Sequence, residues 1–230
     1  MGKRELVLVA VFALLGIVVY QFTAPPPPPG SVGFSVSGVI RNLRRGVRGP
    51  RETASADSSQ TAAVAPSVTE LRLNIGRVSD VTITGEDRTD VAASLHVEGH
   101  GFDATEAAAV AHGPRVKIET SAGTVTVSLD TTGAPQVSRT QPLPMLSLKL
   151  AVPQRLTVRA EPHIGHFVVT NVAAMDAASS RGETKISGLT GSLRLTHVSG
   201  NLEISGVGSL KLTTRNSHGN VKNVTGEATI

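Results

Sequence analysis

Two imidazoles and a carboxylate occupy alternate positions of one predicted strand. These residues are His96, Glu98 and His100, within the segment VAASLHVEGHG. Alternate side chains of a strand share one face, and zinc accepts imidazole and carboxylate ligands. However, side chains two residues apart on a strand lie about 6.5–7 Å from each other, which is awkward for sharing one ion. Exposed polar residues on a strand face are the simpler interpretation, so the trio is kept as the metal candidate and no cofactor is predicted.

A second pair of imidazoles lies at His163 and His166, on either side of Gly165. The carboxylate nearest to this pair in the sequence is Glu161. The same spacing argument applies, because strand side chains this far apart do not readily converge on one ion. We expect these histidines to be exposed polar residues as well.

A glycine-containing turn imitates a nucleotide-binding loop. The segment GHGFDA, residues 99–104, follows a predicted strand and leads into the predicted helix, Asp103–Ala111, with Asp103 as its N-cap. Glycines in such a turn let the backbone approach a pyrophosphate at a helix N-terminus. This helix is too short to cross back over a parallel sheet, and no second βαβ unit follows. Dinucleotide binding is therefore not predicted.

No catalytic constellation is present in the sequence. Nucleophile-elbow, phosphate-loop, zinc-protease and EF-hand motifs are missing, and the chain has no cysteine, which excludes disulfides, thiolate metal sites and a cysteine nucleophile. Charged residues do recur at Lys185, Arg194, Glu203 and Lys211, and they form a mixed ladder if neighbouring repeats stack. A glycosidase would need a second acid beside Glu203, which the repeats do not offer. We predict that the protein is not an enzyme.

Those charges belong to a repeat of nine residues that runs from Gly182 to Ile230. Gly182, Gly191 and Gly200 are nine residues apart, and each repeat carries apolar residues at its third and fifth positions. A short fixed period is typical of a solenoid, in which each unit covers the apolar face of its neighbour. Whether one turn contains two repeats or three is left open by the sequence.

The chain before the repeats also has the period-two alternation of strands. Segments such as VTELRLNI, RVKIET and MLSLKLAVP alternate apolar and polar residues. We therefore expect an all-β fold, a single-stranded β-helix or solenoid over residues 67–230. This region carries fifteen Lys or Arg and fifteen Asp or Glu, so nucleic-acid binding has no electrostatic footprint.

The first 66 residues differ in composition from the rest, with seven Lys or Arg against three Asp or Glu. Residues 1–24 are predicted to be a transmembrane anchor, because residues 6–24 are almost entirely apolar. A cleaved signal peptide is the alternative, but its apolar core is normally shorter. Residues 25–66, which open with five prolines, are predicted to be a flexible basic linker. Lys3 and Arg4 favour a cytoplasmic amino end, which gives a single-pass protein of the cell membrane with an extracytoplasmic domain.

The order of these segments resembles the bacterial β-strand-repeat adhesins, a large family of envelope proteins of mostly unknown function. The matching pieces are NIGRVSDVTITG, LSLKLAVP, GHFVVTNV and GETKISGLTGSLRLTHVSGNLEISGV, and the resemblance covers residues 68–230. It implies a β-helix-like solenoid outside the cytoplasmic membrane. It implies no catalytic residues, because the shared motifs are structural glycines and apolar positions.

These observations predict a structural or recognition role, as an adhesin, an envelope scaffold or part of an envelope stress module. The expected partners are the membrane, through residues 6–24, and an envelope polymer or another protein. One alternative is a solenoid-type carbohydrate-active enzyme. Another is an accessory subunit that pairs edge to edge through an open end at residues 219–230, where the repeat breaks off; a truncated sequence would produce the same pattern.

Overall fold

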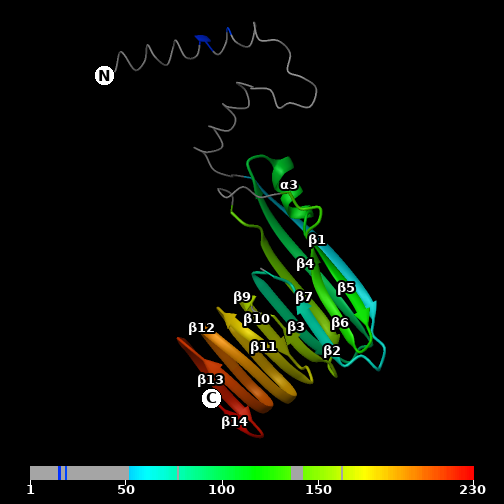
Figure 1. The fold of residues 1–230 in the computed structure, drawn as a ribbon, viewed down its shortest axis with the longest axis vertical. Coiled ribbons are helices and arrows are strands. Elements are labelled where there is room, and N and C mark those ends of the chain that lie inside the picture. Colours follow the sequence, from blue (N-terminus) through cyan, green and yellow to red (C-terminus); the bar gives the residue numbers. More distant parts are fainter. Residues whose placement is uncertain (1–14, 17–18, 20–51, 77, 136–141, 162) are drawn as a thin grey trace, which may run out of the picture. The chain divides into compact units, whose positions relative to one another are not determined.

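The computed structural model describes residues 15–16, 19, 52–76, 78–135, 142–161 and 163–230 (Figure 1). The chain divides into two compact units, residues 1–49 and 50–230. In the first unit the described residues Leu15, Gly16 and Val19 are helical. The second unit consists of strands and, among its described residues, one helix.

The strands and the helix have the following bounds. The strands are β1 (Glu52–Ala63), β2 (Glu70–Asn74), β3 (Asp80–Glu86), β4 (Asp90–Gly101), β5 (Arg115–Ser121), β6 (Thr124–Asp130), β7 (Met145–Pro153), β8 (Thr157–Ala160), β9 (His163–Ile164), β10 (His166–Thr170), β11 (Ala174–Arg181), β12 (Thr184–Thr214), β13 (Ser217–Val224) and β14 (Ala228–Thr229). The helix is α3 (Ala104–His112).

These strands form one sheet of 14 strands in the order β1-β4-β7-β3-β10-β12-β11-β8-β2-β6-β5, while β13 and β14 pair with β12 and β9 pairs with β11. The pairs β1–β4, β4–β7 and β5–β6 are antiparallel. The remaining pairs are parallel, such as β3–β7, β3–β10, β10–β12 and β2–β8. β12, at 31 residues, passes from one layer of the sheet to the other, so the two layers are continuous.

The two ends of this sheet approach each other, which nearly closes it. Side chains of β1 join the outermost strand at the other end, β5. The Ser58 hydroxyl accepts the Val116 N–H at 3.4 Å, and the Gln60 side-chain carbonyl accepts the Ile118 N–H at 2.8 Å. β1 and β5 are thus connected by side chains rather than by a ladder of backbone hydrogen bonds.

Alternating apolar residues of both layers fill one core. Leu71 and Leu73 of β2, Ile83 of β3 and Phe167 of β10 are almost completely buried, and they belong to a single cluster. Because neighbouring strands keep a fixed register, like positions lie side by side, as Ile83 beside Val169. Burial of each such side chain contributes about 1.5–3 kcal/mol, which makes this core the main source of stability.

Glycines stacked on one another set the spacing of the C-terminal strands. Gly165, Gly182 and Gly200 have φ values of 134°, 112° and 114°. A Cβ on Gly200 would lie 2.8 Å from the Gly182 carbonyl carbon, and one on Gly182 would lie 3.0 Å from that of Gly165. Gly200 therefore lies over Gly182, two nonamers earlier, and not over Gly191. This answers the question that the sequence left open: one turn of the chain contains two nonamers.

The fold class predicted from the sequence needs correction. The chain is all-β, but a single-stranded β-helix over residues 67–230 is wrong, because antiparallel strands and α3 complete a nearly closed sheet. Alternation of apolar and polar residues is common to parallel and antiparallel strands, so it could not distinguish the two. The predicted linker is also wrong at residues 52–63, which form β1, whereas residues 25–51 lie outside the described residues.

The predicted transmembrane helix, residues 1–24, lies outside the described residues apart from Leu15, Gly16 and Val19. Across the part of the chain that the structure describes, no helix combines the length and the apolar character needed to cross a membrane. The transmembrane helix in the predicted fold class is therefore not supported.

Candidate functional site

The sheet presents two outer faces to solvent. We call face A the outward side chains of β1, β4, β7, β3, β10 and β13, with residues 184–187 and 200–207 of β12, which pair with β10 and β13. We call face B those of β5, β6, β2, β8, β11 and β14, with residues 193–199 and 210–211 of β12. The inward side chains of the strands beneath the two faces meet in the common core, except for most of those of β1, which face α3 and β5.

The metal candidates lie on face A but do not converge. His96 Nδ1 lies 2.8 Å from Asp57 Oδ1, across the antiparallel pair with β1. His100 Nδ1 lies 3.5 Å from the Thr53 hydroxyl, and Glu98 lies opposite Ser55. Among the described residues, no group of three His, Cys, Asp or Glu side chains is placed to hold a metal ion. The structure therefore gives each histidine its own partner on β1.

The two histidines of the second pair lie on different strands. His163 lies on β9 and His166 lies on β10, with Gly165 at φ 134° between them. His166 Nδ1 is 3.1 Å from Glu183 Oε2, and Glu183 Oε1 is 2.8 Å from Lys185 Nζ. The Lys185 ammonium, with a smaller contribution from His166, lowers the pKa of Glu183. Glu183 is thus held as a carboxylate between two basic side chains.

Together these pairs form a row of ionisable and hydroxyl side chains across face A. Register places the row at right angles to the strands, with neighbours about 4.8 Å apart. In order, it contains Asp57, His96, Ser147, Asp80 and His166. Glu183 extends the row through its 3.1 Å contact with His166 Nδ1. The sequence could not show this row, because its members come from five different strands and the segment before β12.

The glycines of GHGFDA have a packing role. A Cβ on Gly99 would lie 2.6 Å from the Ala111 backbone nitrogen, so α3 can pack on β4 only because residue 99 is glycine. Asp103 accepts the Glu106 N–H at 2.8 Å, and Glu106 accepts the Phe102 N–H at 3.1 Å. The predicted N-cap at Asp103 is confirmed. Side chains of the helix thus satisfy backbone N–H groups at its start, in a variant of the capping box in which Glu106 accepts from the residue before the N-cap.

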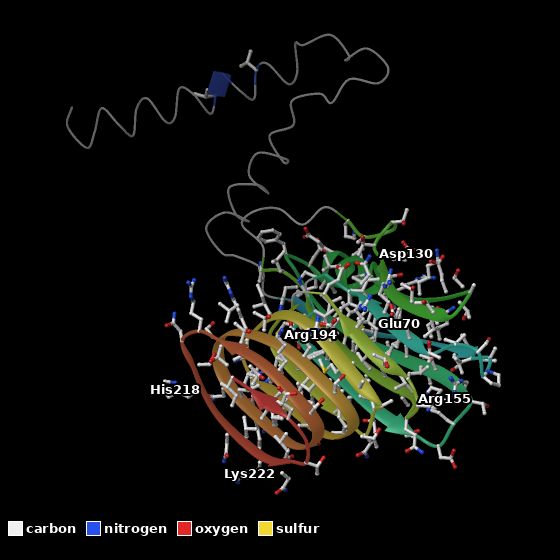
Figure 2. The ribbon with its side chains drawn as sticks, turned by 60° about the horizontal axis from the view of Figure 1, so that its bottom comes forward. Glu70, Asp130, Arg155, Arg194, His218 and Lys222 are labelled. Carbon is white, nitrogen blue, oxygen red and sulfur yellow. The ribbon has the colours of Figure 1, made fainter. Side chains whose placement is uncertain are left out.

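On face B, acidic and basic side chains alternate from one strand to the next. Glu70 binds Arg72 at 2.9 Å and Arg159 at 3.7 Å. Arg159 lies beside Asp176, and Asp176 lies beside Arg194. Figure 2 labels Glu70 and Arg194 among the side chains of these strands. On this face Glu70 therefore pairs with basic residues of β2 and β8, and Lys117 and Glu119 form a separate ion pair on β5.

The charged ladder predicted from the repeats is divided between the two faces. Lys185 and Glu203 lie on face A, where the Glu183 carboxylate and, to a smaller extent, the Glu203 charge raise the pKa of Lys185. Arg194 and Lys211 lie on face B. The predicted ladder is wrong because stacked neighbours are two nonamers apart, so successive nonamers alternate between the faces.

An apolar cavity of about 910 Å³ lies at one end of the sheet. Its lining includes Ile75, Val78, Leu129 and Leu146, and the described residues around it contain no ionisable side chain. Most ligand pockets combine apolar walls with a few convergent polar groups. This cavity is large but its described lining lacks charged side chains that could orient a ligand, and the sequence pattern did not predict it.

Comparison with known proteins gives little further information. No family model matches the chain, and no curated protein matches it. A solved structure described as a putative cell adhesion protein from Clostridium sporogenes ATCC 15579 is 10% identical, with a TM-score of 0.41 over 76% of this chain and 100% of that one. A putative adhesin from Parabacteroides merdae ATCC 43184 is 8% identical, with a TM-score of 0.24 over 76% and 96%. At TM-scores below 0.5, neither likeness establishes a shared fold or function.

Proposed function

We propose that this protein is a recognition module that binds an extended polymer or a partner protein along the outer faces of its sheet. The observation that carries the proposal is the polar row of face A, in which Asp57, His96, Asp80, His166 and Glu183 are aligned across strands. A flat array of this kind makes many weak contacts with an extended partner, as the surfaces of repeat proteins do.

The charge state of the carboxyl groups favours binding over catalysis. Hydrogen bonds and basic neighbours lower the pKa of Asp90, Asp130 and Glu183. A general acid needs a raised pKa in order to keep its proton near neutral pH. These three groups are instead carboxylates near neutral pH, which is the form that accepts hydrogen bonds and binds cations.

An extracytoplasmic location belongs to the same proposal, because polymers of the cell envelope are encountered there. Protease treatment of intact cells that carry a tag at residue 230 tests it. Digestion from outside is the expected result. Protection until the membrane is broken places the tagged end inside and contradicts this part of the proposal.

The binding role is tested with the full-length protein and a panel of envelope polymers and proteins. We expect saturable retention of at least one component, with its chain length unchanged after long incubation. Depolymerisation that disappears in the Glu183→Gln variant would show a carbohydrate-active enzyme instead. If the protein binds none of the polymers and proteins in the panel, recognition as the function is also contradicted.

A further inference from the structure

Charge is distributed unevenly along the second unit. Residues 188–230 carry Arg194, Lys211, Arg215 and Lys222 against Glu203 and Glu227. Residues 67–230 carry fifteen charges of each sign, so subtraction leaves eleven basic and thirteen acidic residues in 67–187. The C-terminal strands are thus the basic end of a neutral unit. Figure 2 shows Lys222 and His218 projecting from β13 at this end.

On face B, the basic residues of these strands border a shallow hollow, which we call the Arg194 hollow. Its volume is about 360 Å³, and its lining includes Ser192, Arg194, Ser209, Lys211 and Glu227. The small serine side chains leave the space, because the larger Leu193 and Leu210 point into the core. Two basic groups, the Glu227 carboxylate and the hydroxyls of Ser192, Ser209 and Thr229 therefore surround one opening.

The two basic side chains of the hollow differ from Arg72 and Arg159 on the same face. Arg72 and Arg159 are paired with Glu70. Arg194 and Lys211 are exposed, and no carboxylate oxygen of the described residues lies within 4.0 Å of either charged group. The like charges of Arg194 and Lys211 repel each other, and the neighbouring carboxylates of Asp176 and Glu227 offset part of this repulsion without forming an ion pair with either group. Their arrangement is complementary to a single acidic group.

We propose that the Arg194 hollow binds the carboxylate groups of an acidic polysaccharide. The proposal rests on the recognition function above and specifies its partner. Arg194 and Lys211 bind the carboxylate by charge-assisted hydrogen bonds. The Ser192 and Ser209 hydroxyls donate to and accept from the hydroxyl groups of the sugar ring.

Two further observations select this class of polymer. The aromatic residues of the described part of the chain are Phe102 and Phe167; Phe167 is in the core and Phe102 precedes α3, so the hollow has no aromatic ring on which a neutral sugar could stack. Asp176 and Glu227 lie next to the basic pair and repel a polymer whose charges are densely spaced. Double-stranded DNA carries one charge per about 1.7 Å, whereas a polyuronate such as polygalacturonate carries one carboxylate on each sugar.

The test measures binding of the full-length protein to immobilised polygalacturonate, with dextran and duplex DNA as comparison polymers. We expect the Arg194→Ala and Lys211→Ala double variant to bind polygalacturonate at least tenfold more weakly than the unmodified protein. We also expect its affinity to depend less steeply on salt concentration, because fewer counterions are released. The matched control is Arg72→Ala on the same face, whose side chain is already paired with Glu70; it should retain binding within about twofold.

Equal binding by the double variant and the unmodified protein overturns the proposal. Binding to dextran or DNA as tight as to polygalacturonate also overturns it, because the hollow would then not select carboxylated sugars. If the protein binds some other envelope component in the experiment above, but not polygalacturonate, this inference fails while the recognition function stands. Thermal unfolding of each variant is the control for folding. Since both residues are exposed, we expect the unfolding midpoints of the variants to equal that of the unmodified protein.

Discussion

Replacement of Gly200 by alanine tests whether stacked glycines hold the C-terminal turns together. At φ 114°, Gly200 has a backbone conformation that other L-residues rarely adopt. A Cβ there would lie 2.8 Å from the Gly182 carbonyl carbon and closer still to its oxygen. The substitution therefore combines backbone strain with a clash against backbone, which cannot rotate away as a side chain could.

The magnitude follows from these two parts. Backbone strain of this kind costs about 1–3 kcal/mol. Relief of the clash moves two turns apart and weakens nearby backbone hydrogen bonds such as Gly182 N–H to Ser199 O at 2.9 Å, each worth about 0.5–1.5 kcal/mol. We expect a loss of about 3 kcal/mol in the free energy of unfolding. For a unit of this size the midpoint of thermal unfolding then falls by about 6–12 °C.

The assay is thermal unfolding of the full-length protein followed by circular dichroism, with two control variants. Gly206 also has a positive φ, 62°, but the nearest atom to its Cβ would be the Gly188 nitrogen at 3.6 Å. Gly206→Ala should therefore show strain alone, about 1–2 kcal/mol. Gly133 has open space around it and no positive φ, so Gly133→Ala should change stability by less than about 0.5 kcal/mol. If Gly200→Ala and Gly206→Ala unfold at the same temperature, the stacking argument is refuted.

Three further predictions concern the core, a buried histidine and the helix. Phe167→Ala should lower the free energy of unfolding by about 3–5 kcal/mol in urea titrations, whereas Ile230→Ala, at a side chain 77% exposed, should have almost no effect. Burial lowers the pKa of His197, against an opposing hydrogen bond with the Gly200 backbone. As the pH falls below the ordinary value of 6.5, the unfolded chain therefore binds a proton that the folded protein does not, and stability decreases. Urea titrations between pH 7.5 and 5.5 should show this decrease in the free energy of unfolding, and the decrease should be smaller in His197→Gln. If the free energy of unfolding depends on pH equally in the variant and the unmodified protein, the prediction is contradicted. Asp103→Ala should lower the free energy of unfolding by about 1 kcal/mol through loss of the N-cap, whereas Asp103→Asn should retain most of this stability in the same assay.

The sequence was a good guide to individual elements and a poor guide to their neighbours. The alternating strands and the Asp103 cap follow from local rules, because side-chain alternation and capping involve residues close in the chain. The stacking of Gly200 over Gly182 could not be inferred, since a nine-residue period fits two or three repeats per turn. For the same reason, the sequence did not predict that Arg194 and Lys211 lie on one face of the sheet and Lys185 and Glu203 on the other.

β1 shows a different limit. Its inward residues include Ala54, Ala56 and Ala62, with Ser58 and Gln60 between them. They are half-buried against α3 and β5 rather than in the main core, so small and polar side chains suffice there. That composition is also typical of a flexible linker. The alternation of alanine with polar residues indicates a strand, but without large apolar side chains it did not lead to the prediction of one.

The side-chain connection between β1 and β5 has a consequence for how the protein opens. Hydrogen bonds from Val116 and Ile118 to Ser58 and Gln60 occupy amides that would otherwise be available to an added strand, so they protect this edge from aggregation. They are also fewer than the bonds of a full ladder. The sheet therefore has a seam, a line along which it separates at lower cost than elsewhere. In hydrogen exchange, the amides of Val116 and Ile118 should become labelled before those of the central strands, and separation along this line should be the first step of unfolding.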